Sequence, residues 1–188
     1  MLIMKIRQTL ICAIVALSFS FSAFAQQSHQ GNFFIQTAFG VVPTYFLDGA
    51  KTVVPPLNVS VNYRFSPVIS AGAFSGFSSS KIVRSFKDGS LHQWANDSWV
   101  FGVQFAAHST NFKKVDVYGG GRLAYSQPGI SHTVLIPGED QVMVPKIQQG
   151  FVYGGFLGIS MGIANNIGAY AELGYGISLF DLGLNVKL

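Results

Sequence analysis

Charge and cysteine are both scarce in this sequence. Charged residues make up 11% of the chain, against roughly 25% in a typical soluble domain. The only cysteine, Cys12, lies within an N-terminal apolar run, and the bulky Ile11 before it argues against lipidation of its thiol. Removal of this run leaves a mature chain without a thiol, which excludes disulfides, thiolate catalysis and cysteine metal sites.

The N-terminal run has the features of a secretory signal peptide. Lys5 and Arg7 precede apolar residues from Leu10 to Phe21, and the small-residue exit Ala23-Phe24-Ala25 follows. We predict cleavage after Ala25, so that residues 1–25 are the signal peptide, 26–32 a periplasmic N-terminal arm and 33–188 one folded domain. The mature chain then has ten Lys and Arg against eight Asp and Glu, and this balance gives no case for nucleic-acid binding.

Long apolar runs are lacking after the signal peptide, so we expect no transmembrane helix in the mature chain. Strict alternation is present instead, most clearly from Leu57 to Ser66, where apolar and polar residues follow one another with a period of two. The predicted strands are residues 33–42, 57–66, 68–77, 99–107, 115–125, 151–161, 167–175 and 179–188. Their length of about ten residues is what a tilted strand needs to cross a bilayer.

The connections between these strands alternate in length. Three of the four odd-numbered connections are the longest in the chain, namely residues 43–56, 78–98 and 126–150. Outer-membrane barrels place short turns in the periplasm and long loops outside. We therefore predict an all-β, eight-stranded antiparallel up-and-down transmembrane β-barrel in the outer membrane, with both termini in the periplasm.

Charge placement separates a membrane barrel from a soluble one, because a soluble lipocalin-like barrel has its apolar side inward. Here the charged strand residues all fall on the face opposite the apolar row, and we predict a network inside the barrel made of Arg64, Asp116, Arg122, Glu172, Asp181 and Lys187. Because an unpaired buried charge costs several kcal/mol, we expect Arg122 to meet Glu172 and Asp181, and Arg64 to meet Asp116 and Lys187. Aromatic residues also sort to the strand ends, as two interfacial girdles would require.

The last strand resembles the C-terminal signal of outer-membrane proteins that the barrel-assembly machinery reads. Asp181, Gly183, Val186 and Leu188 occupy its positions, with Leu188 in place of the usual terminal Phe. Over residues 31–188 the layout is similar to the small barrels of the outer membrane protein X and outer membrane protein A transmembrane-domain type. The resemblance implies the assembly machinery and periplasmic chaperones as partners in biogenesis, outer-membrane lipid and lipopolysaccharide as surroundings, and no cofactor.

Three functions remain open from the sequence. An eight-stranded barrel is just wide enough to be filled by its own side chains, which favours a structural or surface-interaction role with a plugged interior. A narrow channel for small solutes is the alternative. A lipid A-modifying enzyme is the second alternative, to which the segment His108-Ser109-Thr110-Asn111 has a loose similarity. His108 is expected to face inward at a periplasmic strand end, so we assign no catalytic residues. The histidines lack the spacing of metal ligands, so we assign no metal site.

The predicted second outer loop, residues 78–98, is basic and carries the only candidate ligand contacts outside the barrel. Lys81, Arg84, Lys87 and Trp94 are candidates for binding phosphates on lipopolysaccharide or another anionic surface, and the simpler interpretation is solvated loop charge. The third outer loop, residues 126–150, has apolar residues on both sides of Gly138-Glu139-Asp140 and predicts a β-hairpin that extends past the membrane.

The C-terminal motif generates a test of assembly. Deletion of Leu188 should lower the amount of protein folded into the outer membrane, because it removes the terminal apolar contact, whereas Leu188→Phe should be neutral or better. Quantifying folded protein in isolated outer membranes measures this. Equal assembly of the deletion variant would show that the resemblance is misleading.

Overall fold

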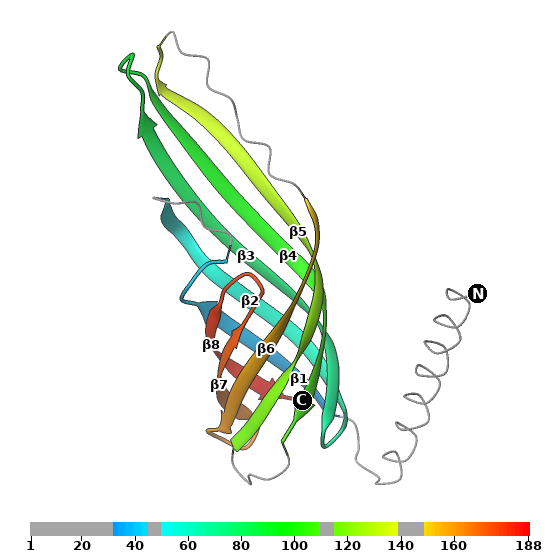
Figure 1. Ribbon diagram of the computed structural model, residues 1–188. Coiled ribbons are helices and arrows are strands. Elements are labelled where there is room, and N and C mark those ends of the chain that lie inside the picture. The colour runs from blue at the N-terminus through cyan, green and yellow to red at the C-terminus, as the bar shows by residue number, and fades with distance from the viewer. Residues whose placement is uncertain (1–31, 45–49, 110–114, 139–148) are drawn as a thin grey trace, which may run out of the picture. The chain divides into compact units, whose positions relative to one another are not determined.

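The computed structural model describes residues 32–44, 50–109, 115–138 and 149–188. They form a closed barrel in which each strand pairs with the next and β8 pairs with β1 (Figure 1). The strands are β1 (Asn32–Gly40), β2 (Lys51–Ser66), β3 (Ile69–Ser85), β4 (Leu91–His108), β5 (Val115–Ile136), β6 (Gly150–Gly162), β7 (Ile167–Gly174) and β8 (Phe180–Lys187). The predicted all-β class and eight antiparallel strands are confirmed. The predicted signal peptide and nearly all of the N-terminal arm lie outside the described residues.

The barrel has apolar side chains outside and polar side chains inside. Along β4, Trp99, Phe101, Val103 and Phe105 are 44–61% exposed, whereas the inward Gln104 is 5% exposed. The same alternation on the other strands buries Gln36, Ser60, Asn62, Ser70, Arg122, Glu172 and Asp181. A protein folded in water buries apolar surface instead, so this arrangement suits a hydrocarbon solvent. Within the described ranges, no helix is long and apolar enough to span a membrane.

Two glycines allow interior rings to lie close to the barrel wall. A side chain at Gly158 would lie 2.6 Å from the Tyr118 hydroxyl oxygen, and one at Gly183 would lie 2.6 Å from the Tyr170 ring. Gly183 therefore has a packing role in addition to its place in the C-terminal motif.

Residues 78–98 are not a loop, which corrects the sequence prediction. The β3–β4 ladder continues from Ser78↔Ser98 to Ser85↔Leu91, and the turn between the strands has Gly89 at φ +82°. The alternation criterion failed because Ser78-Ser79-Ser80 offers no contrast between apolar and polar positions. Backbone hydrogen bonding continues the strands regardless.

Strand β5 also extends past the barrel at the same end as β3 and β4, and it pairs with β4 as far as Ile136. In Figure 1, β3, β4 and β5 project well beyond the other strands. We call this projection the outer sheet; it comprises residues 78–85, 91–98 and 126–136. Of the hairpin predicted at 126–150, the first half is thus a strand of the outer sheet, and residues 139–148 lie outside the described residues.

The closing seam between β1 and β8 can be tested with engineered disulfides. Thr37 lies directly opposite Leu184, at a Cα separation of about 4.5–5.5 Å for an antiparallel pair, which a disulfide can bridge. Thr37→Cys with Leu184→Cys should crosslink, and Thr37→Cys with Val186→Cys should not, because its diagonal separation of about 7–8 Å is too long. Mobility on non-reducing gels reads the result. Preferential crosslinking of the second pair would mean that the register is shifted.

Candidate functional site

The interior is organised around Arg122 on β5. Its guanidinium carbon lies 4.4 Å from the centroid of the Phe156 ring and 5.1 Å from that of Phe74. Its Nε donates to Gln104 Oε1 at 2.9 Å, and its Nη2 forms an ion pair with Glu172. Arg122 is 8% exposed, so these contacts replace the water that a buried cation has lost.

Two carboxylates share this layer of the barrel. Glu172 and Asp181 lie directly opposite each other on β7 and β8, and each is 3% exposed. The Tyr118 hydroxyl donates to Glu172 Oε2 at 3.3 Å. The structure thus brings Arg122 and Glu172 together, with Asp181 as the neighbour of Glu172.

A chain of amides extends from Arg122 to the opposite wall. Gln104 Nε2 donates to Asn62 Oδ1 at 2.7 Å, and Asn62 Nδ2 donates to Gln36 Oε1 at 3.0 Å. With the rings of Phe74, Tyr118, Phe156 and Tyr170, which are all buried, these groups occupy the cross-section of the barrel. The three amides were not among the predicted interior residues, although each lies at an inward position of the alternation.

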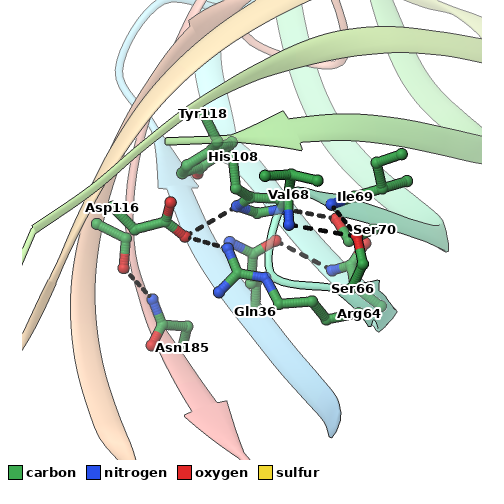
Figure 2. Close-up of polar contacts among 12 residues, drawn as sticks. Gln36, Arg64, Ser66, Val68, Ile69, Ser70, His108, Asp116, Tyr118 and Asn185 are labelled. Atoms are coloured by element: carbon green, nitrogen blue, oxygen red, sulfur yellow. Dashed lines mark hydrogen bonds and ion pairs between the residues drawn. The ribbon is translucent and has the colours of Figure 1, made fainter. Parts of the chain in front are cut away.

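A second polar group, drawn in Figure 2, lies at the end of the barrel where β1 begins and β8 ends, since Arg64 is opposite Asn32 and Lys187 is opposite Phe34. Arg64 Nη2 contacts Asp116 Oδ2 at 2.5 Å, and His108 Nδ1 contacts the same oxygen at 2.8 Å. Lys187, which we expected beside this pair, lies opposite Phe34 on β1 and is exposed. It is therefore at the open end of the barrel, where water replaces the anionic partner that the prediction gave it.

His108 also contacts Ser70, and the three residues have the order of a nucleophile, a base and an orienting carboxylate. His108 Nε2 and Ser70 Oγ are 2.7 Å apart, which is within the distance that an activated serine requires. Ser70, however, is 2% exposed, and it lies in a strand paired on both sides, with Arg64 and with Ala106. A substrate carbonyl therefore has no approach to Oγ. The geometry supports a polar crosslink between β3, β4 and β5, extended to β2 by Arg64.

These contacts do not support a catalytic role for residues 108–111. His108 is bonded to Ser70 and Asp116, and Thr110 lies outside the described residues. Among the described residues, no group of three or more His, Cys, Asp and Glu is arranged to hold a metal ion.

The predicted anion contacts do not form one cluster. Lys81 and Arg84 fall on opposite faces of β3 because they are three residues apart in a strand, and Lys87 lies in the turn before β4. Trp94 is 7% exposed and packs 5.1 Å from the His132 ring. The prediction that residues 78–98 form one loop placed these side chains together. In the structure they are separated by their positions on β3, on β4 and in the turn between them.

The central ion pair generates a stability test. Arg122→Ala should lower the free energy of unfolding by about 3–5 kcal/mol, because it leaves Glu172 and Asp181 buried without a cation. Glu172→Ala should cost less, since Asp181 remains beside Arg122, and the double variant Arg122→Ala/Glu172→Ala should be more stable than Arg122→Ala.

Urea titration of the barrel in phospholipid vesicles, followed by tryptophan fluorescence, measures these differences. Lys187→Ala is the control on the same inward face and should change stability by less than about 0.5 kcal/mol. If Arg122→Ala and the double variant unfold at the same urea concentration, the two side chains do not stabilise each other.

Comparisons with known proteins find the fold and not a sequence family. No protein-family model and no curated protein matches the chain. The structure is similar to the outer membrane protein OprG from Pseudomonas aeruginosa, with a TM-score of 0.56 and 11% identity over 84% of this chain and 96% of that one. It is also similar to the N-terminal β-barrel domain of Pseudomonas aeruginosa OprF (TM-score 0.49, 15% identity, 85% of this chain and 100% of that one). A further match is Ail, the attachment invasion locus protein of Yersinia pestis (TM-score 0.41, 12% identity, 84% and 94%). The likeness to OprG confirms the predicted architecture, and the chain has the fold of a small outer-membrane β-barrel.

Proposed function

We propose that this protein is an integral outer-membrane barrel with a structural or surface-interaction role, closed inside by its own side chains. The observation that carries this proposal is the inverted polarity of the barrel. Its exposed band is apolar, while Arg122, Glu172 and Asp181 are buried at its centre. Only a surrounding hydrocarbon phase makes both halves of this arrangement favourable.

Rings at both edges of the apolar band support a membrane position. At one edge the ring centroids of Phe77 and Trp99 are 4.7 Å apart, and Tyr125 contacts both Phe101 and Phe151. At the other edge Tyr63 contacts Phe33 and Phe65 at 4.8 and 4.9 Å. Aromatic girdles at two interfaces are typical of outer-membrane barrels.

The proposed orientation places the outer sheet outside the cell and both termini in the periplasm. The eight residue steps from Trp99 to Leu91, at about 3.3 Å each, carry β4 about 26 Å along its own direction beyond the aromatic row. A paired sheet of this length is a rigid support for contacts with other molecules, which favours surface interaction over a purely structural role.

The occupied interior favours a plugged barrel over the narrow channel, because solutes would have to displace the Arg122–Glu172 pair and the rings around it. The lipid A-modifying alternative has less support, since Ser70 is buried. Mass spectrometry of lipid A from cells with and without the protein tests that alternative directly.

Electrophoresis and conductance together test the proposal. The folded barrel should resist detergent at room temperature and change its mobility on a gel only after boiling, because its backbone hydrogen bonds are closed on themselves. In planar bilayers the wild-type protein should give no regular conductance steps. Recovery in the soluble periplasmic fraction without a mobility shift would exclude the membrane position, and reproducible steps would favour the channel.

A further inference from the structure

A groove crosses the aromatic row on the outer surface of the barrel. It has a volume of about 510 Å³ and is lined by Asp97, Trp99, Phe101, Gln127, Pro128, Gly129 and Gln149. Trp99 and Phe101 are 50% and 46% exposed on the apolar side of the row, and Asp97, Gln127 and Gln149 are exposed on its polar side. The volume is within the range of small-molecule sites, about 300–1,000 Å³. The groove therefore offers rings to a hydrocarbon chain and amide groups to a polar headgroup.

Two lysines lie on β2 and β3, the strands that continue the sheet beyond the β4 side of this groove. Lys51 and Lys81 are directly opposite each other on β2 and β3, and both are exposed. Lys81 also pairs with Ala95 on β4, which is two residues from Asp97 on the same face of the strand. Like charges directly opposite in a sheet are destabilising, so an anion bound between the two ammonium groups would stabilise this part of the sheet.

The carboxylate of Asp97, on the same face of the sheet as Lys81, already accepts a hydrogen bond. Ser79 Oγ donates to Asp97 Oδ1 at 2.6 Å. The ion pairs among the described residues are those of Arg64, His108 and Arg122, so within these ranges no ion pair compensates the charge of Lys51 or Lys81.

The height of the lysines matches the headgroup layer of a lipid. Lys81 is four residues beyond Phe77, the ring partner of Trp99. Four steps of about 3.3 Å on a strand tilted by about 45° place its backbone about 9 Å beyond the aromatic row. The headgroup region extends about 5–8 Å from the hydrocarbon, and a lysine side chain is long enough to reach back into it.

We propose that the groove and the Lys51–Lys81 pair bind one phosphorylated glycolipid of the outer leaflet. An acyl chain lies along Trp99 and Phe101, the sugar hydroxyls bond to Gln127, Gln149 and the free oxygen of Asp97, and a phosphate lies between the lysines. A sugar headgroup explains the three polar side chains, which a simple phosphate monoester would leave unused. This inference rests on the proposed outer-membrane position and names the lipid that the outer surface recognises.

Native mass spectrometry of the refolded barrel in detergent tests the proposal, with lipid A carrying two phosphates as the probe. The wild-type protein should retain one lipid A molecule. Lys51→Ala/Lys81→Ala should bind it about thirtyfold more weakly, as expected for two lysines facing an anionic lipid. The matched control Arg84→Ala/Lys87→Ala removes two charges from the same hairpin, one from the other face and one from the turn, and should bind like the wild type. Equal weakening by both double variants would overturn the proposal.

Three further arms identify the ligand. Dephosphorylated lipid A should bind the wild type as weakly as lipid A binds Lys51→Ala/Lys81→Ala; equal binding of the two lipids would remove the phosphate from the site. Trp99→Ala, with both lysines intact, should also weaken retention, and unchanged retention would remove the groove. Inorganic phosphate at millimolar concentration should not displace the lipid, and displacement would mean that the lysines bind free phosphate.

The gel shift on boiling separates this inference from the proposed function. A variant that shows the shift but does not bind the lipid is a folded barrel in which only the glycolipid site is impaired. A wild-type protein without the shift would instead disprove the membrane barrel on which the site depends.

Discussion

The hydrogen-bonded seam between β1 and β8 is the constraint on which the rest of the molecule depends. It runs from Phe34↔Lys187 to Gly40↔Asp181 and leaves the membrane-spanning part of the sheet without an open edge, as a bilayer requires. With only eight strands, closure gives an interior that side chains must fill. Inward residues are thereby brought close to residues of strands far away in the sequence. A buried inward charge, such as that of Arg122, therefore needs an opposite charge on another strand.

The need of each buried charge for an opposite charge explains why the interior charges lie in two layers, one around Arg122 and one around Arg64. Arg122 needs Glu172 at the centre, where both side chains are buried, and the amides of Gln104 and Asn62 extend its contacts across the barrel. At the end of the barrel, Arg64 and Asp116 are each about 30% exposed in their side chains, so water shares in their solvation. The Arg122–Glu172 pair therefore contributes more to closing the barrel. The Arg64–Asp116 pair mainly connects the strands at the end of the barrel.

The sequence predicted those features that depend on alternation alone. The alternation in residues 57–66 located a membrane strand, and the face of each charged residue predicted which of them would be interior. The need to pair buried charges also predicted the contacts of Arg122 with Glu172 and of Arg64 with Asp116. Contacts between groups without opposite charge, such as His108 with Ser70, were not predicted, because a period of two places a residue on a face and not at a height. The outer sheet was missed because Ser78-Ser79-Ser80 gives no contrast between apolar and polar positions, although all three residues are buried. The ladder of backbone hydrogen bonds continues through them regardless.

The change of solvent at the Trp99 row determines where new binding properties can arise. On the membrane side of that row, an outward side chain must be apolar. Buried charges inside the barrel need partners of opposite charge, so few substitutions are tolerated on either face. Beyond the row the outward face can carry Asp97, Lys81 and Lys51 without a desolvation cost. At this boundary, apolar rings and charged side chains lie within one lipid's length of each other. A molecule that is itself half apolar and half charged fits such a boundary better than either a soluble ion or a hydrocarbon chain does.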